Sequence, residues 1–376
     1  MKTIILDQKT LFYASSEEKE RHTVKQVGQV FISENEPRNT LLDRFDLLRA
    51  GARENLDFLR KNGYRVLLHT DLTIRDTKAL LANAVLEHAV SEVITTRSIR
   101  DKLDGIVWGK DDEDLALAVF EDAKLIQIAQ EAGLPTAAIV RDRREGKNFA
   151  TLHIDEYDEI DDAVYQAEVI FKIAFAIANK PGCRIVGLDG MDLVGKAFFA
   201  HKLVAFLRAL GVSGKILKLS DFKNPVEVTY AGEDIVEAYY FHAFNCNKLI
   251  EEILEPIRSE GVIDKTLIYF SEESGPVGRE RQYKIDKNDI CILEGVHMYR
   301  EPLIDYFDMK IYLFMDGQEA KHRALVRDIY SGNEPLADEY EKKQLPAQKM
   351  YSSRYSPIDL SDFAVDNTQY RRPYIV

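Results

Sequence analysis

The chain has 376 residues, 45% of them hydrophobic and 30% charged, which is enough apolar material for folded cores and excludes a wholly disordered chain. Asp and Glu number 63 against 50 Lys and Arg, and the formal charge of −13 argues against a general binder of nucleic acids or anionic membranes. Three widely spaced cysteines form neither a disulfide framework nor a zinc motif. The N-terminus does not resemble a signal peptide and no later stretch is long and apolar enough to span a bilayer, so we expect a cytoplasmic protein.

Predicted strands and helices alternate along the first half of the sequence. This pattern is typical of a parallel sheet covered by helices on both faces, and it predicts an α/β domain with a Rossmann-like fold. The elements expected from hydrophobic periodicity and from Gly or Pro stops are a strand at 3–6, a helix around 41–61, a strand at 65–69, a helix over about 74–89, short strands at 93–96 and 106–108, a strand over 115–120, a helix ending at Gly133 and a strand at 136–140.

A polar segment over 142–158 and a helix of about twenty residues separate this series from a second alternating one. The helix stops at Pro181-Gly182, because proline cannot continue a helix. We therefore predict one domain over 1–158, a connecting helix over 159–180 and a second α/β domain over 181–376. The second series contains RIVGLD, KILKLS, TLIYF, ICILEG and KIYLFM as strands, a helix to Leu210, a long helix to about Arg258 and two further helices.

The strongest motif lies at the start of the second series, in GLDGMDLVGK. A buried strand leads into Gly190, and Gly195 and Lys196 open a helix, which is the order of a phosphate-binding loop. Glycines let backbone N–H groups turn toward an anion, and the lysine reaches the outer phosphates. Such loops continue with Ser or Thr, whose hydroxyl binds Mg²⁺, but here the position is Ala197. Asp192 is a candidate replacement ligand, and the alternative is that it only solvates the turn.

From residue 184 to the C-terminus the chain resembles the uridine kinase-like branch of the phosphoribulokinase/uridine kinase family of P-loop kinases. Beyond the loop, the likeness rests on segments that follow in the family's order: SDFKNP (220–225), a tyrosine-rich stretch (234–257), ICILEGVHMYREPLIDYFDMKIYLF (290–314), RALVRD (323–328), PAQKMY (346–351) and FAVDN (363–367). The resemblance implies a P-loop kinase-like parallel sheet.

The same resemblance implies an activity: transfer of the γ-phosphate of ATP, with Mg²⁺, to a hydroxyl of a nucleoside or similar small molecule. Gly190, Asp192, Gly195, Lys196 and Ala197 would then form the nucleotide site. In that scheme Glu294 would order the metal through water together with Asp192, and Arg323 and Arg327 would point at the transferring phosphoryl group. The alternative for the two arginines is a solvated helix face.

The departures from the family fall at the chemistry. The position of the family's general base is Ser220, and the adjacent Asp221 is the remaining candidate, although it would point the other way from an extended segment. Lys223 stands where a histidine is common, and Ala197 removes a metal ligand. Together these changes predict a weak kinase unless Asp192 and Asp221 substitute.

The first half resembles the haloacid dehalogenase-like (HAD-like) hydrolases. The likeness rests on FLRKNGYRVLLHTD (58–71) and FEDAKLIQIAQEAGLPTAAIV (120–140). It implies Asp7 as the phosphoryl acceptor, but Lys9 occupies the acid/base position, so we expect a degenerate domain. The remaining roles that it implies are phosphate contact by Thr70, charge balance by Lys110, and Mg²⁺ binding by Glu121 and Asp122. The alternative for these two acids is a solvated helix start.

Two functions remain open from the sequence. The first is an ATP-dependent small-molecule kinase with an unusual metal and base site. The alternative is a catalytically inactive nucleotide-binding sensor or scaffold, a pseudokinase fused to a pseudo-phosphatase. The expected partner is a small-molecule hydroxyl substrate, without nucleic acid or membrane. The sequence does not identify the acceptor, and it leaves a homo-oligomer open.

Overall fold

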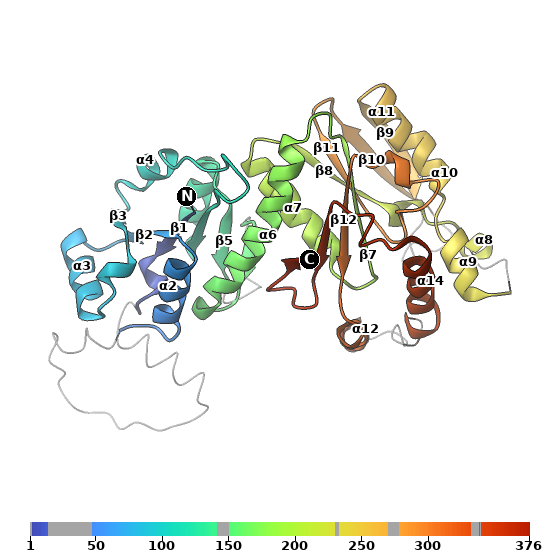
Figure 1. Ribbon diagram of the computed structural model, residues 1–376. Helices are drawn as coiled ribbons and strands as arrows, with labels where there is room; N and C mark the ends of the chain where they lie inside the picture. The colour runs from blue at the N-terminus through green and yellow to red at the C-terminus, as the bar shows by residue number, and fades with distance from the viewer. Residues whose placement is uncertain are drawn as a thin grey trace. The chain divides into compact units, whose positions relative to one another are not determined.

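The structure is a computed structural model that describes residues 2–13, 47–140, 150–229, 233–269, 278–331, 338 and 340–376 (Figure 1). The chain forms two compact units, residues 1–172 and 173–376. The division falls within helix α6 (Ile160–Asn179), in the segment where we expected a connecting helix. In the described part of the chain, no helix combines the length and the apolar character needed to cross a membrane.

The first unit contains a six-stranded sheet in the order β3-β2-β1-β4-β5-β6, and all five neighbouring pairs are parallel. This is the strand order of a Rossmann-like fold, so the predicted class is confirmed. Every residue of the two central strands β1 and β4 is buried, as expected for strands covered on both faces. The strands are β1 (Thr3–Asp7), β2 (Arg65–Thr70), β3 (Glu92–Thr95), β4 (Ala116–Phe120), β5 (Thr136–Ile139) and β6 (Leu152–Ile154).

The helices of this unit follow the predicted alternation with three corrections. The helix expected over about 74–89 ends at Asn83. The helix expected from about residue 41 begins only at Ala52, because Gly51 adopts a left-handed φ of 77° and the chain turns there. Residues 41–46 lie outside the described part. The segment at 106–108 forms no strand. The helices are α2 (Ala52–Lys61), α3 (Ile74–Asn83), α4 (Ile99–Asp104), α5 (Ala123–Glu131) and α6.

The second unit contains a six-stranded sheet in the order β14-β13-β12-β7-β11-β8, parallel except for the short β14. Strands β9 and β10 form a separate antiparallel hairpin. Residues 270–277, between these two strands, lie outside the described part. The strands are β7 (Ile185–Gly190), β8 (Gly214–Lys218), β9 (Ile263–Tyr269), β10 (Arg279–Ile285), β11 (Ile290–Glu294), β12 (Met309–Phe314), β13 (Phe363–Asp366) and β14 (Tyr374–Ile375).

The long helix expected to reach about Arg258 is interrupted. Residues 243–245 pair with the segment after β8: Asn224 N donates to Ala243 O at 2.9 Å and Asn245 N donates to Phe222 O at 2.7 Å. These backbone bonds are incompatible with a continuous helix, so the prediction of one helix is wrong. The helical segments of this unit are α7 (Lys196–Ala209), η5 (Leu219–Phe222), α8 (Val226–Thr229), α9 (Ile235–His242), α10 (Cys246–Leu249), η6 (Ile250–Leu254), α11 (Glu255–Ser259), η7 (Ile304–Tyr306), α12 (Gly317–Ser331), η8 (Tyr340–Gln344) and α14 (Leu345–Tyr355).

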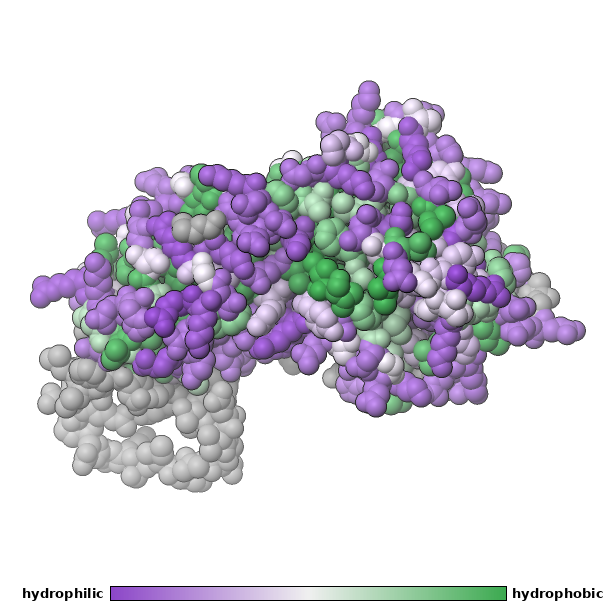
Figure 2. Space-filling view, viewed as in Figure 1, coloured by the Kyte–Doolittle hydropathy of each residue, from purple (hydrophilic) through white to green (hydrophobic). Residues whose placement is uncertain are grey.

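Apolar side chains are concentrated inside both units. Hydrophilic side chains cover most of the visible face, with smaller apolar patches among them (Figure 2). All six residues of β7 are buried, and so are the first four of β11. These strands therefore form a rigid base whose carboxyl ends carry the candidate site of the second unit.

Candidate functional site

The turn between β7 and α7 has the backbone of a phosphate-binding loop. At Gly190 the chain passes so close to β12 that a Cβ would lie 2.3 Å from the carbonyl oxygen of Leu313. Gly195 precedes α7 with a left-handed φ of 94°, and Leu193 also has a positive φ of 63°. The two glycines are therefore required by the close approach and by the turn, and the loop ends at the N-terminus of a fourteen-residue helix.

The Lys196 side chain folds back across this loop. Its Nζ donates to the carbonyl oxygens of Gly190 at 3.1 Å and Met191 at 2.7 Å. These contacts hold the ammonium over the loop, and no carboxylate is within ion-pair distance of it among the described residues. A bound anion could therefore take the Lys196 donors by replacing neutral carbonyl groups, which is less costly than breaking an ion pair.

Two side chains from distant elements brace the loop. Asn367 Nδ2 donates to Val194 O at 2.6 Å. The Arg323 guanidinium, from α12, donates to Leu193 O at 3.4 Å and Val194 O at 3.3 Å, to Asn367 O at 2.9 Å and Thr368 O at 2.8 Å, and to Glu319 Oε1 at 2.7 Å. Arg323 thus joins the loop to the end of β13 in this structure.

The predicted phosphoryl contacts of the two arginines have different outcomes. Arg323 could point at a phosphoryl group only by giving up its bonds to the loop carbonyls, so its assigned role stays a prediction. The side chain of Arg327 lies outside the described part of the chain, so its predicted role stays a prediction. Sequence spacing alone could not reveal the bracing role of Arg323, because its partners in the loop and after β13 are more than 40 residues away.

The two carboxylates predicted to hold the metal come from the loop and from the strand beside β7. Glu294 ends β11, next to β7 in the sheet, and its side chain is half-buried. Burial raises the pKa of the Glu294 carboxyl, and the positive charges of Lys196 and Lys218 oppose this rise. Asp192 lies in the loop and accepts a hydrogen bond from Tyr239 Oη at 3.4 Å.

The carboxylates of Asp192 and Glu294 fit one of the ways in which proteins bind Mg²⁺. Across the described residues, no three His, Cys, Asp or Glu side chains are grouped to form a metal site made by protein alone. Mg²⁺ commonly uses one or two carboxylates together with substrate phosphates and water, and Asp192 and Glu294 could supply that number. Ala197 adds no oxygen, so a metal here would depend on the nucleotide for its remaining ligands.

Asp221, the candidate base, is tied to the hairpin. It lies in the 3₁₀ turn η5 rather than in an extended segment, and its side chain is buried. Its Oδ2 accepts a hydrogen bond from Tyr283 Oη at 2.9 Å and forms an ion pair with Arg281, both from β10. The neighbouring Ser220 is exposed. Tyr283 and Arg281 occupy Oδ2, so Asp221 could accept a proton there only if these partners moved away.

The tyrosine-rich stretch that begins at residue 234 has both buried and exposed aromatic side chains. Tyr240 is buried, whereas Phe241 is 49% exposed. Arg300 lies 4.0 Å from the ring centre of Tyr240, and Arg354 lies 5.9 Å from that of Phe241. His297 is buried beside Tyr240, and burial lowers its pKa to about 3, so the ring is neutral at physiological pH. Phe241 and the two arginines are the exposed or half-buried members of this group.

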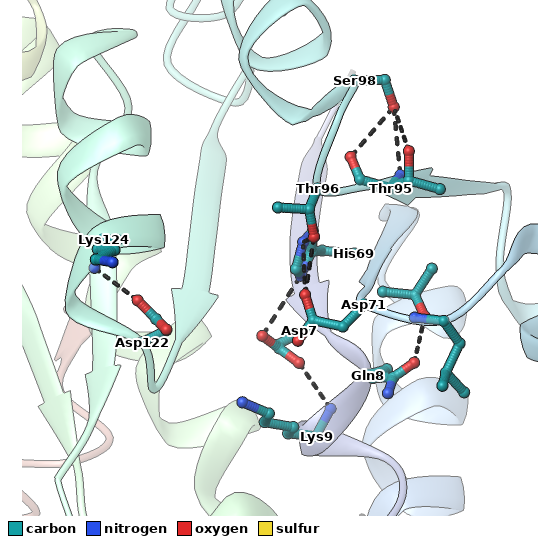
Figure 3. Close-up of polar contacts among 12 residues, drawn as sticks. Asp7, Gln8, Lys9, His69, Asp71, Thr95, Thr96, Ser98, Asp122 and Lys124 are labelled. Carbon is teal, nitrogen blue, oxygen red and sulfur yellow. Dashed lines mark hydrogen bonds and ion pairs between the residues drawn. The ribbon is translucent and has the colours of Figure 1, made fainter.

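The predicted HAD-like residues in the first unit gather only in part (Figure 3). Asp7 and Thr70 end the adjacent strands β1 and β2, and Glu121 and Asp122 follow β4 on the other side of β1. Lys110 is placed differently: its N–H donates to Asp114 Oδ2 at 3.3 Å, just before Leu115, whose carbonyl pairs with Thr3 at the start of β1. The backbone of Lys110 therefore lies toward the edge of the sheet opposite to Asp7, and its charge-balancing role stays a prediction.

The side chains that do gather are already engaged with the protein. Asp7 is 1% exposed; its Oδ1 accepts from Lys9 N at 2.9 Å, and its Oδ2 lies 3.5 Å from His69 Nδ1. Asp122 caps α5 by accepting from Lys124 N at 2.7 Å, and Glu121 accepts from Tyr157 Oη at 2.8 Å. The helix-start alternative therefore describes the geometry of Asp122.

The Thr70 hydroxyl is also hydrogen-bonded to groups of the protein. Its hydroxyl bonds Gln8 and, at 2.8 Å, Thr77, and it accepts from Leu72 N at 3.0 Å. His69, which the sequence did not single out, lies between Asp7 and Asp71 and has Nε2 3.2 Å from Thr96 Oγ1 (Figure 3). Asp7 is thus buried and Thr70 is hydrogen-bonded within the protein, and the degenerate character expected from Lys9 stays a prediction.

The order of β7, loop, α7 and the acid-ended β11 in the second unit is that of the kinase segments found in the sequence. Residues 185–335 match the phosphoribulokinase/uridine kinase family. The predicted resemblance of the C-terminal half is thereby confirmed. No curated protein matches the chain in sequence.

Solved structures similar to the chain fall into two groups. A possible uridine kinase from Bacillus stearothermophilus is 20% identical, with a TM-score of 0.44, over 54% of this chain and 98% of the other. A HAD-superfamily hydrolase from Ehrlichia chaffeensis is 16% identical, with a TM-score of 0.30, over 44% of this chain and 98% of the other. L-2-haloacid dehalogenase from Xanthobacter autotrophicus is 13% identical, with a TM-score of 0.31, and the shares covered are again 44% and 98%.

The close packing at Gly190 leads to a stability prediction. We expect Gly190→Ala to lower the stability of the second unit by about 2 kcal/mol or more, because the new methyl group would overlap the carbonyl of Leu313. Gly317→Ala is the matched control, since a Cβ there meets nothing within 4 Å. Thermal unfolding followed by circular dichroism would give the two Tm values, and equal values would contradict the proposed clash.

Proposed function

We propose that the second unit binds ATP with Mg²⁺ and transfers its γ-phosphate to a hydroxyl group of a small molecule. The observation that carries this proposal is the Lys196 ammonium held over a phosphate-binding loop, with Glu294 at the end of the adjacent strand. Phosphoryl transfer depends mainly on positioning and charge neutralisation, and these residues supply both. The match to the kinase family supports the same reaction class.

The residues have distinct parts in this proposal. The loop amides and Lys196 would hold the β- and γ-phosphates, and Asp192 and Glu294 would hold Mg²⁺, which neutralises charge on the phosphates when bound. Arg323 and Asn367 would keep the loop in its binding shape. Asp221 would take the proton of the acceptor hydroxyl once Arg281 had released it.

The acceptor is proposed only as a class. Phe241, Arg300 and Arg354 offer an aromatic face and positive charge, which suit a small molecule with a ring or an anionic group. The first unit would act as a scaffold, because its Asp7 is buried and Lys9 occupies the acid/base position.

A nucleotide sensor without turnover is the second candidate. The ion pair between Asp221 and Arg281 favours it, because it neutralises the remaining candidate base. Both candidates require ATP binding, and they differ in metal dependence and turnover.

The test is calorimetric titration of ATP into the full-length protein, first with Mg²⁺ and then with EDTA. Binding that requires Mg²⁺ supports the kinase, and nucleosides and sugar alcohols would then be screened for ADP release. Binding that is indifferent to the metal, without acceptor-dependent ADP release, supports the sensor. Absence of binding under both conditions would overturn both candidates.

Restoring the missing hydroxyl should strengthen the metal site. We expect Ala197→Thr to raise the Mg²⁺-dependent affinity for ATP by about tenfold, the effect of one ligand contributing about 1.4 kcal/mol. Affinity in EDTA should not change. Phe198→Thr is the control, because it adds the same hydroxyl one residue later on a side chain that is 78% exposed. An equal gain in both variants, or none in Ala197→Thr, would contradict the prediction.

A further inference from the structure

A buried carboxylate lies directly before the phosphate loop. Asp189 is the penultimate residue of β7 and is 0% exposed. Its Oδ1 accepts from Gly190 N at 2.8 Å, and its Oδ2 accepts from Met298 N at 3.0 Å and from Tyr351 Oη at 2.5 Å. The carboxylate therefore holds the first peptide of the loop, the turn after β11 and helix α14 at one point.

The contacts extend beyond these three partners. Tyr351 Oη also accepts from Tyr299 N at 2.9 Å. The Tyr299 hydroxyl reaches the carbonyls of Gly187 at 2.8 Å in β7 and Ile311 at 2.7 Å in β12. The loop is thus anchored to the sheet and to α14 through a connected, buried network, which is rigid when every member is satisfied.

The charges around Asp189 are unbalanced. Burial raises its pKa to about 6, and the positive charge of Lys196, with the hydrogen bonds from Tyr351 and the backbone, opposes this rise. The other titratable groups that face it are Tyr299, Tyr312 and Tyr351, whose pKa values are all raised by burial and by the Asp189 charge, so they stay neutral. Lys196 therefore favours the charged form of Asp189 in the free protein without forming an ion pair with it.

Binding of a triphosphate would change this balance. The phosphates would draw the Lys196 ammonium away from the Gly190 and Met191 carbonyls and would bring negative charge to the loop that Asp189 supports. A carboxylate beside a new anion favours its protonated form. We propose that Asp189 is a positioning residue of the phosphate loop and that it takes up a proton from solvent when ATP binds. This inference rests on the proposed function of the loop.

The sign and size of the effect follow from linkage. With a pKa of about 6 in the free protein, Asp189 is about one-tenth protonated at pH 7. If bound ATP raises this pKa above 7, uptake at pH 7 would be about 0.4 to 0.9 proton for each ATP bound. The bound state then holds more protons, so the affinity for ATP falls as the pH rises through this range.

The experiment is calorimetric titration of Mg²⁺–ATP into the full-length protein in two buffers that differ in ionisation enthalpy, at pH 6, 7 and 8. The dependence of the observed heat on the buffer gives the number of protons taken up. The Asp189→Asn variant should lose the proton uptake by Asp189. The proton changes of ATP and Mg²⁺ themselves should remain in this variant. The difference in uptake between wild type and variant therefore gives the part due to Asp189.

Tyr351→Phe is the second variant. It removes a hydrogen bond that lowers the pKa of Asp189, and it leaves the carboxylate in place. The pH range of uptake should therefore move upward by about one unit. In Asp189→Asn an amide N–H would face the N–H of Met298, and two donors repel each other. If that variant does not fold for this reason, the shift in Tyr351→Phe tests the inference.

The outcomes separate this inference from the proposed function. No ATP binding by the wild type overturns both. ATP binding with equal proton uptake in wild type and Asp189→Asn, or with an unchanged pH range in Tyr351→Phe, overturns the inference and leaves the ATP site in place.

Discussion

Lys196→Ala should lower the affinity for ATP by about 100-fold or more, because the variant loses the cation that contacts the outer phosphates. In the free protein the ammonium bonds two loop carbonyls, of Gly190 and Met191, which are weak partners compared with phosphate oxygens. Substitution should therefore cost little stability and mainly affect ligand binding. Calorimetric titration with ATP and a parallel Tm measurement would separate these effects.

Arg208→Ala is the matched control for this prediction. Arg208 is a cation on the last turn of the same helix, exposed and distant in sequence from the loop. Its removal should leave ATP affinity within about twofold, as expected for a surface charge. Equal affinities in Lys196→Ala and the wild type would show that the glycine turn is not a phosphate site.

Asp221→Asn should reduce kcat by about 10²- to 10⁴-fold if Asp221 takes the proton of the acceptor. The affinity for ATP should not change, since Asp221 follows β8 and contacts β10 rather than the phosphate loop. Steady-state ADP release with an acceptor found in the screen would measure kcat, and titration would measure binding.

The alternative to a catalytic role is that Asp221 only anchors the hairpin, and Tyr283→Phe tests this alternative. That variant removes one hydrogen bond to Asp221 and leaves the carboxylate. If Asp221 only anchors the hairpin, both variants should lower the Tm and neither should lower kcat beyond the loss of folded protein.

Ser220→Asp adds an exposed acid at the family's base position, and we expect it to raise kcat. An unchanged kcat would indicate that proton transfer does not limit turnover.

The sequence alone determined the parts of this protein that depend on local chemistry. Alternating apolar runs and Gly or Pro stops identified two α/β halves, because hydrophobic periodicity and backbone restriction act over a few residues. Gly190, Gly195 and Lys196 form a motif of fixed spacing. The missing oxygen at Ala197 and the lysine at position 9 are visible for the same reason, since each is a single residue type at a known place in a motif.

The tertiary structure alone decided which partners these residues meet. Asp221 is paired with Arg281, 60 residues away, and Arg323 holds loop carbonyls 129 and 130 residues away. Asp189 precedes the loop as an unremarked acid, and only packing brings Met298 and Tyr351 to its carboxylate. The backbone of Lys110 lies toward the edge of its sheet opposite to Asp7 because of the path of the chain before β4. Such contacts depend on long-range packing, and the hydrogen bonds and charges that it brings together set both the direction of a side chain and its pKa.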